Sequence, residues 1–256
     1  MATPSYRPET RIVAFLDILG FKDQTKRCLD EPRLLEALDR ALLATDMFVE
    51  PYQGYAAYAR MFSDCICVSS PFEAANTFKF IYMLEAVQMN LACSGVFVRG
   101  AIAIGRHFES PRMILSEALI EGYLLESHEA KFPRIIASES TAAQILAGAQ
   151  AVSEIDSWDG TASSLATNPN AHLRRDEDGR LFLSYLMSLC RIDRSAIIQE
   201  YIWDHKRAVT DWIADGKARN ASANVKAKHE WVRLYHNTMM KELFPGSDVE
   251  DDLVRA

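Results

Sequence analysis

Short apolar runs of strand length alternate along this chain with longer segments in which apolar residues recur every three or four positions. The run at residues 12–16 is rich in β-branched and aromatic residues, which predicts a strand buried on both faces. Similar patterns predict further strands at residues 55–61, 63–69, 96–104, 132–137 and 181–186. Helical periodicity predicts helices at residues 32–50, 71–92, 116–130 and 138–146, and two more between residues 193 and 244.

The order of these elements predicts an α+β fold with one mostly antiparallel sheet, covered by helices on one face. A ferredoxin-like, palm-type βαβ core fits this order. We expect residues 1–150 to form that core, and residues 151–190 to supply a loop and a late strand that completes the sheet. Residues 191–256 are expected to form a C-terminal helical extension, whose acidic end after Pro245 frays.

Asp17 stands where the first predicted strand stops, and Gly20 follows it at a turn into a helical segment. A carboxylate at the tip of a buried strand requires an ionic partner, hydrogen bonds or a metal ion. The amides around Gly20 could point outward together, as phosphate-binding turns require. An acidic cap on the next helix explains the same residues, and this stretch alone does not decide between the two.

Two further charged residues stand in otherwise apolar surroundings. Asp64 lies at the turn between two predicted strands, where it could face the end of the first strand. Arg99 lies inside a strand of small apolar residues. Arginine is rarely buried without a partner, so Arg99 should face an acid or an anionic ligand, and a purely structural ion pair remains an alternative.

Composition narrows the class of protein. The 256 residues are 49% hydrophobic and 25% charged, which is typical of a soluble globular protein. The net charge of −7 argues against a protein built to hold nucleic acid. Five scattered cysteines indicate a reducing compartment, and no apolar run reaches the length of a membrane span. We therefore expect a cytoplasmic protein with no nucleic-acid or membrane partner.

Three segments in this order and spacing resemble the class III nucleotidyl cyclases. They are Phe15-Leu-Asp17-Ile-Leu-Gly20-Phe21, then Phe62-Ser-Asp64, then Arg99-Gly-Ala-Ile-Ala-Ile-Gly105. The resemblance covers roughly residues 10–147. Within that class the chain looks most like the compact bacterial pyrimidine cyclases of the Pycsar anti-phage system. The helical tail containing Lys228 and Trp231 also fits that group.

The resemblance implies a two-metal site. Asp17 and Asp64 would bind two divalent cations, Mn²⁺ or Mg²⁺, with the Ile18 carbonyl assisting. The amides of the following turn would hold the β- and γ-phosphates of the substrate; they belong to Leu19, Gly20 and Phe21.

The base and the reacting phosphate would be contacted by other residues. Tyr58 occupies the position at which purine cyclases read the base, and its bulk should favour a one-ring base; Met113 is a second expected substrate contact. Ile120 and Leu124 stand where purine cyclases place an Asn and an Arg that stabilise the transition state. Catalytic cations would therefore come from elsewhere, and the nearest candidates are Arg99 and Arg134.

The implied activity is conversion of UTP to 3′,5′-cyclic UMP and pyrophosphate, as a second messenger that acts on a separate effector in anti-phage defence. Cyclic CMP formation from CTP is the alternative product. A cyclase-fold module that binds nucleotide without turnover is another alternative, motivated by Ile120 and Leu124. The resemblance also implies a head-to-tail homodimer with shared active sites.

Overall fold

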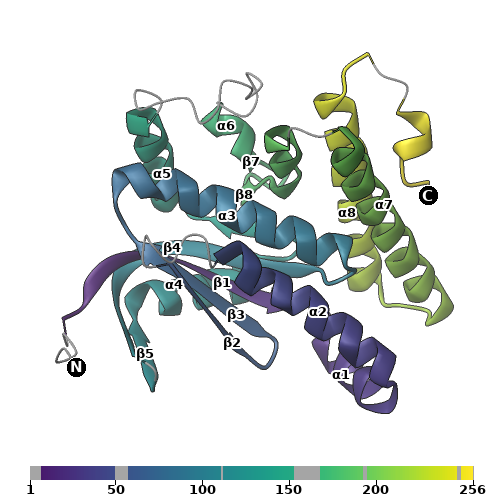
Figure 1. The fold of residues 1–256 in the computed structure, drawn as a ribbon, viewed down its shortest axis with the longest axis horizontal. Helices are drawn as coiled ribbons and strands as arrows, with labels where there is room; N and C mark the ends of the chain where they lie inside the picture. The colour runs from purple at the N-terminus through teal and green to yellow at the C-terminus, as the bar shows by residue number, and fades with distance from the viewer. Residues whose placement is uncertain are drawn as a thin grey trace.

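The structure is a computed structural model that describes residues 7–49, 57–110, 112–152, 168–192, 195–246 and 249–255. Its strands form one sheet in the order β2-β3-β1-β4-β6-β8-β7, with β5 paired to β4 (Figure 1). The strands are β1 (Glu9–Ile18), β2 (Tyr58–Phe62), β3 (Cys65–Pro71), β4 (Val98–Ser110), β5 (Met113–Ser116), β6 (Ile135–Ala137), β7 (Leu173–Arg175) and β8 (Leu181–Leu183). The α-helices are α1 (Phe21–Asp30), α2 (Pro32–Val49), α3 (Ala74–Cys93), α4 (Glu117–Glu129), α5 (Glu139–Val152), α6 (Pro169–His172), α7 (Ser195–Ala218) and α8 (Ala223–Leu243).

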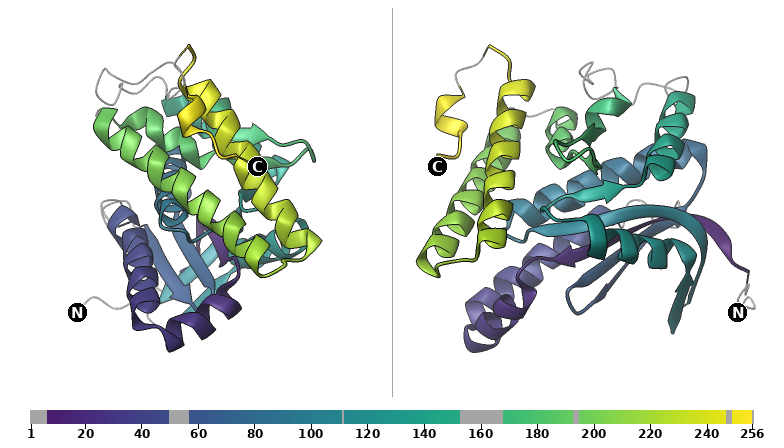
Figure 2. Two further views of the ribbon diagram at one scale, coloured as in Figure 1. Left: turned by 90° about the vertical axis from the view of Figure 1, so that its right-hand side faces the viewer. Right: turned by 180° about the vertical axis from the view of Figure 1, so that it is seen from behind.

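The sheet is mostly antiparallel, as the sequence predicts. The central strand β1 pairs antiparallel with both β3 and β4, and among the described strands only β4 and β6 pair in parallel. Helices cover the sheet on both faces (Figure 2), not on one face as predicted, because α4 packs on the side opposite α2 and α3. The predicted α+β fold is confirmed.

Alternation along β1 sorts its residues between the two faces. Ile12, Leu16 and their neighbours at every second position join the main core under α2 and α3. The residues between them face α4, where Val13 packs with Ala118. Asp17 belongs to this second face because it is an even number of residues from Val13. The strand pleat therefore turns the Asp17 side chain toward α4.

The helices α7 and α8 lie beside the end of the sheet at which β1 terminates (Figure 1). They share an apolar cluster with the short 3₁₀-helix η2 (Tyr185–Arg191). Phe97, next to β4, stacks on Trp212 of α7 with ring centroids 4.3 Å apart. Leu19, directly after β1, packs against the same cluster. The C-terminal helices thus contact the segment that follows Asp17.

Several element boundaries differ from the predicted ones. The strand predicted at residues 181–186 ends at Leu183, because the next residues wind into η2. The strands β5 and β7 were not predicted, since runs of four and three residues carry little periodicity. The polar segment beginning at Gly148 continues α5 as far as Val152. Residues 153–167 lie outside the described residues.

The prediction of a frayed end after Pro245 is wrong for residues 249–255. A 3₁₀ turn, η3 (Glu250–Asp252), precedes the buried Val254. The side chain of Asn237 donates to the Val254 carbonyl at 3.0 Å and accepts from its amide at 2.9 Å. A side-chain amide that mimics a strand partner holds the tail against α8.

Two buried histidines also bind this tail. His236 Nε2 lies 2.8 Å from the Asp252 carbonyl oxygen, and its Nδ1 lies 2.8 Å from Nδ1 of His205. A carbonyl only accepts, so His236 carries its proton on Nε2 and accepts through Nδ1 from the His205 Nδ1–H. His205 Nε2 then accepts from the Tyr185 hydroxyl at 2.8 Å. In this arrangement each imidazole carries one ring proton.

We expect the protein to lose stability as the pH falls below about 6.5. Burial lowers the pKa of His205 and of His236 in the folded state. The unfolded chain therefore binds more protons than the folded protein in this window, and the free energy of unfolding falls between pH 7.5 and pH 5.5. Urea unfolding at the two pH values measures the loss. The double variant His205→Gln/His236→Gln should flatten the pH dependence of the unfolding free energy, whereas His128→Gln, at an exposed position, should leave it unchanged. Equal pH dependence in the wild-type protein and both variants would show that His205 and His236 are not its source.

Candidate active site

Two acidic side chains converge at the end of β1. Asp17 pairs across the sheet with Cys65 of β3, and Asp64 immediately precedes Cys65 in the turn between β2 and β3. One ligand atom from each of these three residues lies within 4.8 Å of the others. The Ile18 amide donates to the Asp64 carbonyl at 2.8 Å, which ties the turn to β1. The structure thus brings together the two aspartates that the sequence places on neighbouring strands.

The donor set at this point fits a hard divalent cation. Carboxylate oxygens are the ligands that Mg²⁺ and Mn²⁺ prefer. The Cys65 thiol donates to Asp64 Oδ1 across 3.6 Å, and burial together with Asp64 raises its pKa to about 12. A thiol with such a high pKa carries no charge at neutral pH. Asp17 and Asp64 are therefore the residues that could hold a metal ion.

Arg99 faces acids, as expected for an arginine in an apolar strand. Its Nε–H donates to Asp17 Oδ2 at 2.9 Å, and Nη1 donates to the Ala130 carbonyl at 3.3 Å. The same Nε lies 2.7 Å from Glu126 Oε1. The Arg99 side chain keeps 28% of its surface exposed. It is a cation held next to the aspartates with part of its fork open to a ligand.

Glu126 is a residue of this site that the sequence did not single out. Its side chain is 4% exposed, and burial raises its pKa, opposed by Arg99 and supported by Asp17. A signal was present: Ala118, Gly122 and Glu126 recur every four residues on the buried side of α4. An acid in line with such small residues faces the sheet. Glu126 therefore holds Arg99 from the helix side.

The turn after β1 offers three backbone amides, and this set is shifted by one residue along the chain from the predicted one. Gly20 adopts φ +73° and caps α1, a left-handed conformation that favours glycine. The Leu19 amide already donates to the Phe97 carbonyl at 2.9 Å. In the described part of the chain, no acceptor is recorded for the amides of Gly20, Phe21 and Lys22. These amides at the start of α1, without Leu19, are available to a phosphate.

Arg134 lies in surroundings that suit a structural role. It is fully buried and forms ion pairs with Asp176 and Asp178. Its guanidinium lies 5.2 to 5.8 Å from the ring centroids of three aromatic residues, Phe132, Phe182 and Trp231. Both acids belong to the turn between β7 and β8. With both Nη groups engaged by acids, Arg134 has a structural role in this subunit.

Tyr58 and Met113 lie away from the two aspartates within one chain. Tyr58 is at the opposite end of β2 from the Asp64 turn, and Arg11 lies over its ring at 5.4 Å. Met113 pairs with Ser110 at the far end of β4 from Arg99. Both side chains are more than 40% exposed. One subunit alone does not unite them with Asp17.

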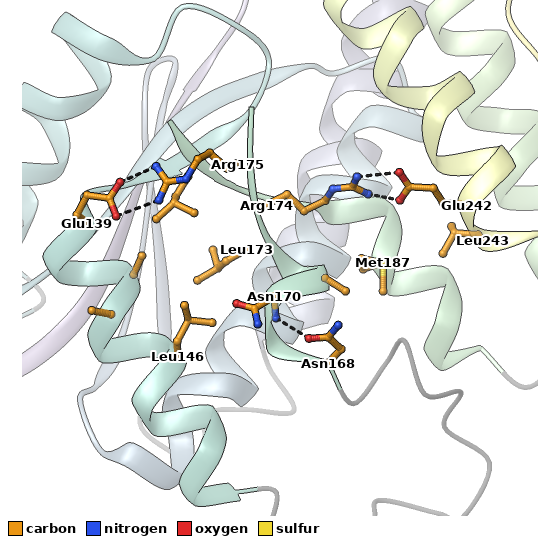
Figure 3. Close-up of a pocket in the computed structure, with 14 residues that line it drawn as sticks. Glu139, Leu146, Asn168, Asn170, Leu173, Arg174, Arg175, Met187, Glu242 and Leu243 are labelled. Atoms are coloured by element: carbon orange, nitrogen blue, oxygen red, sulfur yellow. Dashed lines mark hydrogen bonds and ion pairs between the residues drawn. The ribbon is translucent and has the colours of Figure 1, made fainter. Parts of the chain in front are cut away.

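A separate cavity of about 630 Å³ lies between α5, β7 and α8 (Figure 3). Its two arginines are already paired: Arg174 Nη2 with Glu242 Oε1 at 2.8 Å and Arg175 Nη1 with Glu139 Oε1 at 2.6 Å. None of the residues around Asp17 lines it. The cavity therefore adds no group to the candidate site.

No protein-family model and no curated protein matches the chain. Among solved structures, the adenylyl cyclase CyaB from P. aeruginosa is similar over 55% of this chain and 82% of its own, at 19% identity and a TM-score of 0.44. A guanylyl cyclase domain of the RhoGC fusion protein from the aquatic fungus Blastocladiella emersonii is similar over 54% of this chain and 84% of its own, at 16% identity and a TM-score of 0.42. A class III adenylyl cyclase-like ATP-binding protein from Pseudomonas aeruginosa is similar over 54% of this chain and 35% of its own, at 10% identity and a TM-score of 0.41.

These similarities span about half of the chain, at TM-scores below 0.5. The residues at the end of β1 therefore carry the functional proposal. Within the described ranges, no helix combines the length and apolar character needed to cross a membrane.

Proposed function

We propose that this chain is a metal-dependent nucleotidyl cyclase that converts UTP to 3′,5′-cyclic UMP and pyrophosphate. The observation that carries the proposal is the convergence of Asp17 and Asp64 beside Arg99, next to the open amides that begin with Gly20. Carboxylates for cations, a guanidinium and a turn of amides together suit a metal–triphosphate substrate.

The residues would divide the work of cyclisation. Asp17, Asp64 and the Ile18 carbonyl would hold two divalent cations, Mn²⁺ or Mg²⁺. When bound, such ions lower the pKa of the ribose 3′-hydroxyl and neutralise the leaving pyrophosphate. Arg99, fixed by Glu126, would bind the reacting phosphate through its exposed donors. The amides from Gly20 to Lys22 would orient the terminal phosphates.

We further propose a head-to-tail homodimer in which each subunit completes the other's site. The exposed side of α4 carries Ile120, Tyr123 and Leu124, and their surfaces are 62%, 52% and 47% exposed. Phe62 at the end of β2 is 84% exposed. Apolar side chains gathered in this way favour burial against a second copy. A partner would bring its Tyr58 and Met113 to the aspartates, which one chain does not.

The pyrimidine preference and the biological role rest on the resemblance to the Pycsar cyclases. A tyrosine at position 58 lacks the charge of the residues that read the base in purine cyclases, and its bulk should leave room for a one-ring base. The product would act as an anti-phage second messenger through a separate effector. CTP is the alternative substrate. Binding without turnover is a second candidate, because Ile120 and Leu124 provide no polar group for the transition state.

Incubation of the pure protein with each of the four nucleoside triphosphates and Mn²⁺ tests the proposal, with products separated and identified by mass. Cyclic UMP together with pyrophosphate is the expected result, and cyclic CMP would select the alternative. Cyclic AMP or cyclic GMP as the main product would overturn the pyrimidine assignment. Nucleotide binding without any cyclic product would favour the non-catalytic module.

Replacing Tyr58 with Lys is expected to lower the preference for UTP over ATP by about tenfold, which corresponds to one base contact of about 1.4 kcal/mol. Tyr58→Phe keeps the ring and should keep the preference. The ratio of kcat/KM for the two substrates measures the change. A base profile that is the same in Tyr58→Lys and the wild-type protein would remove Tyr58 from the base pocket.

A further inference from the structure

The C-terminal helix α8 reaches the candidate site through aromatic contacts. Trp231 of α8 stacks on Phe132 with ring planes 11° apart, and its Nε1 donates to Asp176 Oδ2 at 2.6 Å. Phe132 lies two residues after Ala130, whose carbonyl accepts from Arg99. The face of α8 that carries Trp231 is therefore fixed against the segment beside Arg99.

Lys228 precedes Trp231 by three residues, so the two side chains share one side of α8. The Lys228 side chain is half-buried, and the charges that act on it are those of Arg99, Asp17 and Glu126. Lys226, two residues earlier, is exposed. Helix geometry thus directs Lys228, but not Lys226, toward the group of charges at the end of β1.

Lys228 has no ion-pair or hydrogen-bond partner of its own among the residues that the structure describes. Asp17 and Glu126 are both paired with Arg99. Burial and the neighbouring Arg99 lower the pKa of Lys228, opposed by the two acids. Because both acids are already engaged by Arg99, an anion bound at this point would give the half-buried ammonium group a direct partner. Two adjacent cations form the electrostatic complement of a polyphosphate.

We propose that Lys228 is a substrate-binding residue whose ammonium group contacts the triphosphate of the nucleotide bound at Asp17 and Asp64. The identity of the ligand as a nucleoside triphosphate rests on the proposed function. Together with Arg99, Lys228 supplies positive charge that the apolar Ile120 and Leu124 do not. The C-terminal helices are then part of the active site rather than only a packing extension.

Equilibrium binding of α,β-methylene-UTP in Mg²⁺ tests Lys228 without turnover, because the bond that cyclisation would break is not a P–O bond in this analogue. Lys228→Met keeps the apolar stem and removes the charge. We expect it to bind the analogue about 10- to 100-fold more weakly, the range for a lost hydrogen bond to a charged group. Uridine, which has no phosphate, should bind equally well to both proteins. Lys228→Arg keeps the charge and should retain most of the affinity.

Lys226→Met is the matched control on the same helix and should bind like the wild-type protein. Unchanged affinity in Lys228→Met, an equal loss in Lys226→Met, or an equal loss for uridine would each overturn the assignment. The proposed function is read separately from the kcat/KM of the wild-type protein. Triphosphate binding that depends on Lys228 without any cyclic product would reject the cyclase and keep the Lys228 site. Cyclic product with full activity in Lys228→Met would keep the cyclase and reject Lys228.

Discussion

Replacing Asp17 with Asn is expected to reduce formation of the cyclic nucleotide by at least about 100-fold. Metal ions stabilise transition-state charge by several kcal/mol, and each 1.36 kcal/mol corresponds to a factor of ten in rate. A neutral amide is a poor ligand for a hard cation, but its oxygen still accepts from Arg99 Nε, which now donates to Asp17 Oδ2. The loss should therefore appear in kcat/KM measured with Mn²⁺, with little change in the unfolding midpoint.

Asp23→Asn is the matched control, because Asp23 is an exposed carboxylate in the first turn of α1. It should keep wild-type activity. The same experiment on Asp64→Asn should give a loss comparable to that of Asp17→Asn, since we propose that both carboxylates hold the metal ions. Wild-type activity in Asp17→Asn would remove the two-metal assignment, and an equal loss in Asp23→Asn would make the effect non-specific.

Arg134→Met is expected to destabilise the protein by about 3 kcal/mol, the lower end of the range for removing one partner of a buried ion pair. The lower end applies because Asp176 and Asp178 keep part of their surface exposed at 17% and 36%. The change also removes three cation–π contacts, including that with Trp231. For a chain of this size, the midpoint of thermal unfolding should fall by roughly 6–12 °C. Circular dichroism measures the shift.

Arg175→Met is the control for this loss. Arg175 also forms an arginine–glutamate pair, with Glu139, but both side chains are more than half exposed. Exposed pairs contribute less than about 1 kcal/mol, so its midpoint should barely move. An Arg134→Met protein with unchanged stability and lost turnover would instead restore the catalytic role that the sequence suggested. Arg134→Lys should fall between the two, because lysine keeps the charge but not the two-pronged geometry.

The amino-acid pattern alone determined the α+β architecture and the meeting of the two aspartates. Strand and helix periods are local properties, and residues of one period share one face wherever the chain goes. Once the runs beginning at residues 12 and 63 pair as adjacent antiparallel strands, the end of the first lies beside the start of the second, and the two acids are neighbours. The same reasoning predicted that Arg99 would face an acid or an anionic ligand, and its partners are the acids Asp17 and Glu126.

Other parts of the site depend on which segments the tertiary structure brings together. The partners of Arg134 stand 42 and 44 residues further along the chain, and no local period relates them. The Leu19 amide is not free for a phosphate because it donates to the Phe97 carbonyl, which lies opposite it in the folded chain. Lys228 comes under the influence of the charges at the end of β1 through the packing of α8, in which Trp231 donates to Asp176. Periodicity assigns each side chain to a face of its own element, but which charge lies across from it is decided when distant elements pack.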